Sequence, residues 1–288
     1  MYGAMFGDYV GSIYEFDNIK TKDFPLYNPD AGLTDDSYMT IAVASACLSY
    51  ADHRDLDRFS EEAAQEMRRI GDIYPWPKGG YGRMFSYWLD SPNPRPYGSF
   101  GNGAAMRVSP CGLTARSLSE ALELARASAM PTHNHPEGIK GARATAAAVY
   151  LACHGHSKDD IRKFIRMNFY PLDQTLDEIR PDYEFDGSCQ GTVPQAIEAF
   201  LESTSFEDAI RNAISIGGDS DTIGAITGSI AEAYYGMPPE LRKMISDEIE
   251  RRCCQEEQDI VARFRQSFCK QLCSDDRHGE NPGISAGK

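Results

Sequence analysis

Apolar residues recur at helical spacing along most of the chain, in alanine-rich segments that polar loops separate. Three serines, Ser117, Ser157 and Ser205, each stand three residues before an acid, which is a helix-start signal. Alternating β-branched residues, which indicate strands, are nearly absent. The pattern predicts an all-α protein with helices over residues 40–50, 57–70, 118–129, 138–153, 158–167, 193–202, 206–214 and 222–235.

Length and charge narrow the class of protein. The chain has 288 residues, enough for one large domain or two small ones, and no linker-like segment divides it. We therefore expect a single domain over residues 1–273 and a disordered polar tail over 274–288. The formal net charge of −14 argues against general nucleic-acid binding, because phosphate recognition requires a basic face.

The sequence also lacks signals for membranes and export. No apolar run reaches the length of a membrane span, and the first residues lack the layout of a signal peptide. We expect a cytoplasmic monomer with no membrane partner and with its eight cysteines reduced. Four cysteines lie near the C-terminus: Cys253, Cys254, Cys269 and Cys273. They form no Cys-x-x-Cys element, so ordinary thiols are favoured over a zinc site, although their role stays open.

Two acidic clusters each open a predicted helix. Their oxygen-bearing residues are Thr34, Asp35 and Asp36 in the first and Asp219, Asp221 and Thr222 in the second. Hard oxygen donors without His or Cys suit Mg²⁺ or Mn²⁺ rather than zinc. Four carboxylates brought together would repel one another unless cations lay between them. If the clusters meet in space, they predict a site for two metal ions.

Helix capping is the alternative interpretation of these clusters. Thr34 and either Asp219 or Ser220 are good N-cap residues, and acids in a first helical turn complement the helix dipole without any metal. Capping needs one oxygen per helix, whereas both places supply three. The pair of clusters therefore favours the metal interpretation.

Two loops are candidates for ligand binding. Residues 91–103 end in a glycine-rich stretch that runs straight into a helix expected at residues 104–107. This arrangement is typical of an anion cradle at a helix N-terminus and also of a plain turn. His133 and His135 lie in a second tight loop before a predicted helix, where either could face a ligand or the solvent.

Five motifs in order carry a resemblance to a known family. They are Gly7-Asp8-Tyr9-Val10-Gly11 with Glu15, Leu33-Thr34-Asp35-Asp36-Ser37, the segment 98–107, Thr132-His133, and Gly217-Gly218-Asp219-Ser220-Asp221-Thr222. Together they resemble the ADP-ribosylglycohydrolases, the family of the dinitrogenase-reductase-activating glycohydrolase and the vertebrate ADP-ribosyl-acceptor hydrolases.

The resemblance implies a compact orthogonal multi-helix domain with two Mg²⁺ or Mn²⁺ ions in a cleft. By position, the implied metal ligands are Thr34, Asp35, Asp36, Asp219, Asp221 and Thr222. The implied catalytic residues are Glu15, Asp35, Asp36 and Asp221. The implied substrate-binding residues are Gly98, Ser99, Phe100, Gly101, Asn102, Gly103 and His133, with the glycine loop at the pyrophosphate of ADP-ribose and Phe100 near adenine.

The implied activity is hydrolysis of the glycosidic bond between ADP-ribose and a modified acceptor. The favoured acceptor is arginine on a protein, which would make the enzyme reverse mono-ADP-ribosylation. O-linked serine or a small ester is an alternative acceptor, and a non-catalytic ADP-ribose-binding or crystallin-like relative is an alternative of another class. A two-metal phosphohydrolase fits less well, because the clusters contain no histidine. Which carboxylate transfers the proton, and whether Mg²⁺ or Mn²⁺ is preferred, stays open.

Overall fold

A computed structural model describes residues 1–269 of the chain. Helices form all the regular structure of this part, apart from two isolated bridges, Thr34 with Lys78 and Gly101 with Ser188. The predicted all-α class is confirmed. The predicted tail over 274–288, Cys273 and the last residues of the predicted domain lie outside the described residues.

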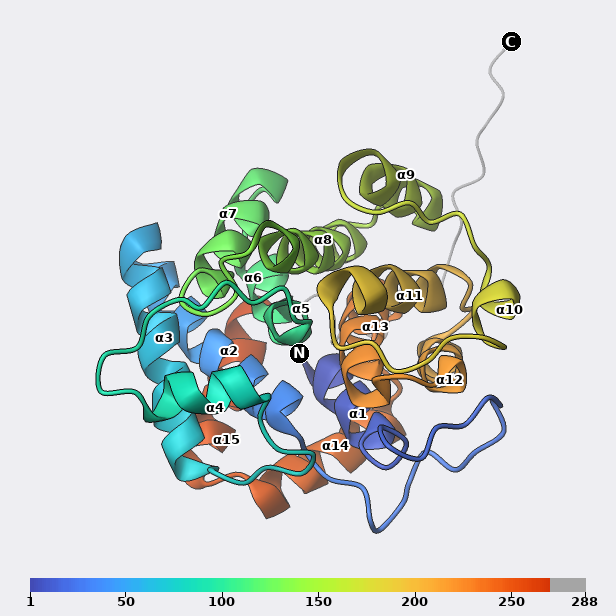
Figure 1. The fold of residues 1–288 in the computed structure, drawn as a ribbon, viewed down its shortest axis with the longest axis horizontal. Coiled ribbons are helices and arrows are strands. Elements are labelled where there is room, and N and C mark those ends of the chain that lie inside the picture. Colours follow the sequence, from blue (N-terminus) through green and yellow to red (C-terminus); the bar gives the residue numbers. More distant parts are fainter. Residues whose placement is uncertain (270–288) are drawn as a thin grey trace.

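Figure 1 shows the helices gathered around a central pair, α1 and α13. In chain order the helices are α1 (Tyr2–Gly11), α2 (Asp35–His53), α3 (Leu56–Ile73), α4 (Arg83–Asp90), α5 (Gly103–Met106), α6 (Ser109–Thr114), α7 (Leu118–Ala129), α8 (Pro136–Cys153), α9 (Lys158–Asn168), α10 (Leu176–Ile179), α11 (Cys189–Leu201), α12 (Phe206–Ile216), α13 (Ser220–Tyr235), α14 (Pro239–Arg252) and α15 (Gln255–Phe268).

The predicted helix starts follow the capping chemistry of the sequence. The side chains of Ser117, Ser157 and Ser205 each accept a hydrogen bond from the backbone N–H three residues later, so α7, α9 and α12 begin where expected. The helix predicted over 193–202 begins earlier, at Cys189, because Ser188 caps it. Pro194 consequently lies inside α11.

A seam of glycines joins α1 to α13. A Cβ added at Gly7 would lie 1.9 Å from the carbonyl oxygen of Gly224, and one at Gly3 would lie 2.1 Å from that of Gly228. Such distances are far inside van der Waals contact, so only glycine permits this close packing. The seam ends at Gly11, whose Cβ would meet the Ser220 carbonyl at 2.4 Å. It therefore holds the C-terminal end of α1 against the first turn of α13.

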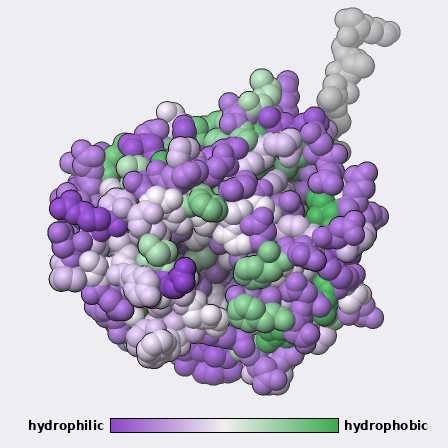
Figure 2. Space-filling view, in the orientation of Figure 1, coloured by the Kyte–Doolittle hydropathy of each residue, from purple (hydrophilic) through white to green (hydrophobic). Residues whose placement is uncertain are grey.

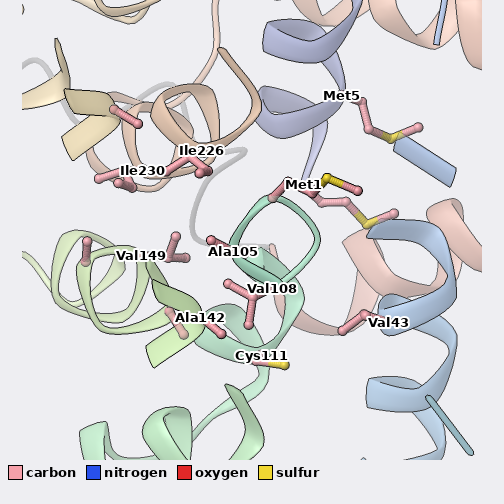
Figure 3. Packing of buried hydrophobic residues seen from close by; sticks show 14 of the residues in the cluster. Met1, Met5, Val43, Ala105, Val108, Cys111, Ala142, Val149, Ile226 and Ile230 are labelled. Carbon is pink, nitrogen blue, oxygen red and sulfur yellow. The ribbon is translucent and has the colours of Figure 1, made fainter. Parts of the chain in front are cut away.

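Large apolar side chains fill the space around this pair. Figure 3 shows buried residues from five parts of the chain converging on one core: Met1 just before α1 and Met5 within it, Val43 from α2, Val108 just before α6 and Cys111 within it, Ala142 and Val149 from α8, and Ile226 and Ile230 from α13. The burial of so much apolar surface stabilises the frame that positions the loops above it. Within residues 1–269, no helix is both long and apolar enough to cross a membrane.

Candidate metal centre

The first turns of α2 and α13 bring the two acidic clusters together. Thr34 is the N-cap of α2 and accepts from the Asp36 N–H at 3.2 Å, so the capping role is real. The Thr222 hydroxyl of α13 donates to Asp36 Oδ2 at 3.3 Å and links the clusters directly. Asp219 is the N-cap residue of α13, but its side chain makes no capping hydrogen bond. That carboxylate instead accepts a hydrogen bond from the Asn102 side chain and lines the cavity.

Glu15 completes the cluster from the loop that follows α1. Ligand atoms of Glu15, Asp219 and Asp221 all lie within 4.8 Å of one another. Gly79 packs against this carboxylate: its φ is 76°, and a Cβ there would lie 2.8 Å from Glu15 Oε2. The glycine seam between α1 and α13 thus brings a carboxylate from the start of the chain to those near residue 220.

Burial and mutual repulsion raise the pKa of every carboxyl group at this centre. Burial, with the charge of Asp219, raises the pKa of Glu15 to about 7, and burial with Glu15 raises that of Asp221 to about 8. Burial, reinforced by neighbouring carboxylates, holds the pKa of Asp35, Asp36 and Asp219 well above the ordinary value. These groups repel one another when ionised and would be stabilised by cations.

The donor set fits a hard divalent cation. All the side-chain donors are carboxylate or hydroxyl oxygens, which Mg²⁺ and Mn²⁺ prefer. Asp36 Oδ1 is buried and has no hydrogen-bond partner among the described residues. An unsatisfied buried carboxylate oxygen is costly, and a metal ion would remove that cost.

Asp8 supports the cluster from beneath and was not among the predicted site residues. It accepts hydrogen bonds from the Thr34 hydroxyl at 2.7 Å, from the Thr34 N–H at 3.1 Å and from the hydroxyl of Ser37. Burial raises its pKa to about 6. The Gly7-Asp8 motif was visible in the sequence, but nothing in the pattern showed that this carboxylate would be fully buried.

A cavity of about 480 Å³ opens over the centre. Most of the predicted site residues line it: Glu15, Asp35, Asp36, Ser99, Gly101, Asn102, Gly103, His133, Asp219, Asp221 and Thr222. The other three do not. Thr34 is buried with its hydroxyl bonded to Asp8, Gly98 lies at the outer end of the loop with φ 67°, and Phe100 stands half-exposed against His135 with ring centroids 5.5 Å apart.

Several backbone N–H groups of the glycine loop have hydrogen-bond partners inside the protein. Helix α5 after it has only four residues, so its dipole is small. Backbone N–H groups are already used inside the protein: Gly98 donates to Asn134 Oδ1, Gly101 to Ser99 Oγ and Asn102 to the Gly187 carbonyl. The loop is thus fixed by its own bonds. It reaches the acidic centre through Asn102 Nδ2, which donates to Asp219 Oδ2 at 2.7 Å.

A buried relay orients His133 toward the loop. Arg107 is 1% exposed and donates from Nη2 to the Thr132 hydroxyl oxygen at 2.8 Å. That oxygen lies 2.7 Å from His133 Nδ1. Because arginine only donates, the Thr132 hydroxyl proton is left to point at Nδ1, and the proton of a neutral imidazole is on Nε2. Burial, with the Arg107 charge, lowers the pKa of His133 well below its usual value and keeps it neutral.

His133 Nε2 faces the glycines of the loop. A Cβ at Gly103 would lie 3.1 Å from this atom, and one at Gly101 would lie 3.6 Å from it. The ring therefore offers a neutral N–H donor on the wall of the cavity. The supporting residues Thr132 and Arg107 belong to two of the five family motifs, but the sequence pattern carried no sign that they contact each other.

The fold and the site together define an all-α protein with a buried acidic centre beside a cavity. A model of the ADP-ribosylglycohydrolase family matches residues 1–272. The chain belongs to the ADP-ribosylglycohydrolase family, and it is an enzyme of the glycohydrolase class.

Individual relatives have low sequence identity to this chain, but the similarity extends over most of its length. ADP-ribosylhydrolase ARH3 of Homo sapiens is 28% identical over 312 residues, which cover 82% of this chain and 84% of the relative. ADP-ribosylarginine hydrolase Tri1 of Pseudomonas putida (strain GB-1) is 26% identical over 265 residues, covering 83% and 71%. A solved structure, an ADP-ribosylglycohydrolase-related protein complex, is similar in fold with a TM-score of 0.61 at 24% identity, covering 92% of this chain and 97% of its own.

Proposed function

We propose that this enzyme, with two Mg²⁺ or Mn²⁺ ions, hydrolyses the bond between ADP-ribose and a modified arginine of an acceptor protein, and so reverses mono-ADP-ribosylation. One observation carries the proposal: the two carboxylate clusters meet at a cavity that the 99–103 loop and His133 also line. The arginine acceptor is supported by the similarity to a relative named as an ADP-ribosylarginine hydrolase.

The cavity offers a path for the substrate. The diphosphate of ADP-ribose would lie along the loop between Ser99 and Gly103, where the neutral His133 Nε2–H donates to an acceptor oxygen. Asn102 stands between this loop and the carboxylates, so the distal ribose would reach the acidic centre. Phe100 lies at the exposed outer side of the loop, where a ring could cover adenine.

The residues that would hold the metal ions are those with oxygens on the cavity side: Asp35, Asp36, Asp219, Asp221 and Thr222. Thr34 would join them only if its hydroxyl oxygen, which already donates its proton to Asp8, also contacts a cation. When bound, such ions act as Lewis acids that orient ribose hydroxyls and lower the pKa of water.

The chain's own residues then orient the substrate and transfer a proton. In hydrolysis, the oxygen of water bonds to the anomeric carbon, the bond from that carbon to the guanidine nitrogen breaks, and a proton reaches the departing nitrogen. We assign the proton transfer to a carboxylate oxygen of Glu15, because this side chain lines the cavity beside Asp219 and Asp221 and burial raises its pKa to about 7. We also propose Asp35, Asp36 and Asp221 as catalytic residues beside Glu15.

The test is the release of free ADP-ribose from three substrates: ADP-ribosyl-arginine, ADP-ribosyl-serine and an O-acetyl ester of ADP-ribose. The proposal expects the arginine substrate to be cleaved with the highest kcat/KM in the presence of Mg²⁺. A higher kcat/KM for the serine or the ester substrate would show that the acceptor is O-linked and not arginine. Binding of ADP-ribose with no release from any of the three would mark a non-catalytic relative.

A further inference from the structure

The tetrapeptide Tyr-Glu-Phe-Asp occurs twice in the chain, at residues 14–17 and 183–186. The first copy follows α1 and contains Glu15 of the acidic centre. The second lies in the loop between α10 and α11. The copies are far apart in sequence, yet the rings of Phe16 and Phe185 stack with centroids 6.4 Å apart and an interplanar angle of 18°.

Both phenylalanines stand at the mouth of the cavity. They line it, and yet Phe16 is 78% and Phe185 53% exposed. Figure 2 shows hydrophobic side chains at the surface on this face among mostly hydrophilic ones. Exposed large aromatic side chains beside a cavity are typical of binding surfaces. The acids of the repeat, Asp17, Glu184 and Asp186, are also exposed, and we call this set with the two phenylalanines the aromatic–acidic lip.

The lip is held in place from below. The tyrosine of each copy turns inward: Tyr14 packs edge-on against Phe24, and the Tyr183 hydroxyl donates to the Gly191 carbonyl at 2.8 Å. The Asn18 side chain exchanges two hydrogen bonds with the backbone of Gly218, at 2.9 and 2.7 Å. The exposed rings are therefore pre-organised, which lowers the entropy lost on binding.

Lys20 joins the two copies. Its ammonium group donates to the Tyr183 carbonyl at 2.6 Å and to the Ile216 carbonyl at 2.5 Å. Carbonyl oxygens rather than the lip carboxylates are its hydrogen-bond partners. The Lys20 charge is thus held on backbone oxygens, and it also acts on Glu184 of the lip. The exposed surface of the lip carries two aromatic rings and three carboxyl groups.

We propose that the aromatic–acidic lip binds basic side chains that flank the modified arginine in the acceptor protein. This rests on the proposed function and extends it from the modified residue to its neighbours. Aromatic faces attract guanidinium and ammonium groups, and nearby carboxylates add complementary charge. The lip adjoins Glu15 at the acidic centre, where the proposed reaction separates the acceptor from ADP-ribose. A protein acceptor with Lys or Arg next to the modified residue fits both features.

The experiment compares two ADP-ribosyl-arginine peptides, one with lysines flanking the modified residue and one with glutamates, and free ADP-ribosyl-arginine. The measured quantities are kcat and KM for wild type and for the double variant Phe16→Ala, Phe185→Ala. Wild type is expected to prefer the lysine-flanked peptide. In the double variant, the ratio of kcat/KM for that peptide to kcat/KM for free ADP-ribosyl-arginine is expected to fall about tenfold, mainly through KM.

Two further variants keep the result interpretable. Tyr27→Ala removes an aromatic ring that is 51% exposed and lies outside the cavity lining, and it is expected to leave the ratio unchanged. Asp17→Asn combined with Glu184→Gln keeps the rings and the side-chain volumes, and it is expected to weaken the dependence of kcat/KM on salt. This second pair tests the lip even if the aromatic double variant does not fold.

The outcomes separate the lip from the reaction itself. Wild type that cleaves both peptides equally, or lip variants with an unchanged ratio, would overturn the role of the lip while leaving the arginine reaction intact. Wild type that cleaves no arginine-linked substrate would instead overturn the proposed function. A dimer that dissociates on Phe16→Ala, Phe185→Ala substitution would assign the lip to a second copy of the chain and overturn the acceptor role.

Discussion

The hydroxyl of Thr222 lies 3.3 Å from Oδ2 of Asp36, although 186 positions separate the two residues in the chain. This hydrogen bond joins the first turns of α2 and α13. The glycine seam makes the approach possible, because it lets α1 pack directly on α13 and place Glu15 beside Asp219 and Asp221. The acidic centre is therefore a consequence of helix packing as much as of the acidic motifs themselves.

The first prediction concerns that seam. Gly7→Ala would place a methyl group 1.9 Å from the Gly224 carbonyl oxygen, which is backbone and cannot move aside cheaply. We expect a loss of about 3 kcal/mol or more in the free energy of unfolding, by overpacking. The measurement is denaturant unfolding followed by circular dichroism. Gly82→Ala is the control, since its methyl group meets nothing within 4 Å; equal stability of the two variants would contradict the seam.

The second prediction concerns pH. In the metal-free protein, folding raises the pKa of Asp8 to about 6, of Glu15 to about 7 and of Asp221 to about 8. The folded state then binds more protons than the unfolded chain, so this contribution to stability is present at low pH and is lost as pH rises from about 4 to about 8. Tm of the EDTA-treated protein, measured by scanning fluorimetry, should fall over this window.

Saturating Mg²⁺ should remove most of that fall, because a cation stabilises the ionised carboxylates of the folded state. Asp221→Asn serves as the comparison, since it eliminates one of the titrating groups, and its metal-free Tm should fall less steeply with pH. A Tm of the EDTA-treated wild type that rises through this window would contradict the assignment.

The third prediction concerns the loop opposite His133. Gly101→Val would fill the space between Ser99 Oγ, 3.2 Å from the added Cβ, and His133 Nε2. We expect the affinity for ADP-ribose to fall at least about tenfold by calorimetry, about 1.4 kcal/mol. Gly82→Val, on another part of the cavity wall with open space around it, is the matched control. Normal ADP-ribose binding by Gly101→Val would show that the loop does not bind ADP-ribose.

The fourth prediction concerns the relay from Arg107 through Thr132. Thr132→Val removes the hydroxyl that donates to His133 Nδ1 but keeps the side-chain shape, whereas Thr132→Ser keeps the hydroxyl. Nitrogen NMR of protein with ¹⁵N-labelled histidine should show the Nε2–H tautomer of His133 in wild type and in Thr132→Ser. In Thr132→Val the tautomers should mix and ADP-ribose affinity should fall. An Nδ1–H tautomer in the wild type would refute the relay.

The sequence predicts those parts of the structure that depend on interactions between residues close together in the chain. Capping serines and apolar periodicity are local, and they placed α7, α9 and α12 well. Helix α1 was not predicted, because its glycines and aromatic residues are poor helix formers by themselves and form a helix only against α13. The i, i+4 spacing of Gly3, Gly7 and Gly11 was the available signal.

The site shows the same division. The two acidic motifs could be named from the sequence, because hard oxygen ligands in clusters have a chemical meaning, whereas Glu15 came only from the family resemblance. The inward turn of Thr34 toward Asp8 and the used N–H groups of the glycine loop could not, because both depend on tertiary contacts. The repeated Tyr-Glu-Phe-Asp is visible in the sequence, but only the structure shows that Phe16 and Phe185 stack on each other.

Dependence on a hard metal ion can be examined separately. EDTA should abolish ADP-ribose release, and Mg²⁺ or Mn²⁺ should restore it, whereas Zn²⁺ should not, because the donors are all oxygen. The readout is free ADP-ribose after exhaustive chelation and stepwise metal addition. Full activity of the chelated protein would show that the reaction needs no metal ion.

The most direct test of the central claim is the pair Asp219→Asn and Asp221→Asn, each assayed for both turnover and binding. Either substitution removes an anionic ligand with almost no change in volume, so the fold should persist. ADP-ribose release from ADP-ribosyl-arginine is expected to fall by at least about a hundredfold, while calorimetry still detects ADP-ribose bound along the loop. Turnover equal to wild type in both variants would contradict a catalytic centre at these carboxylates.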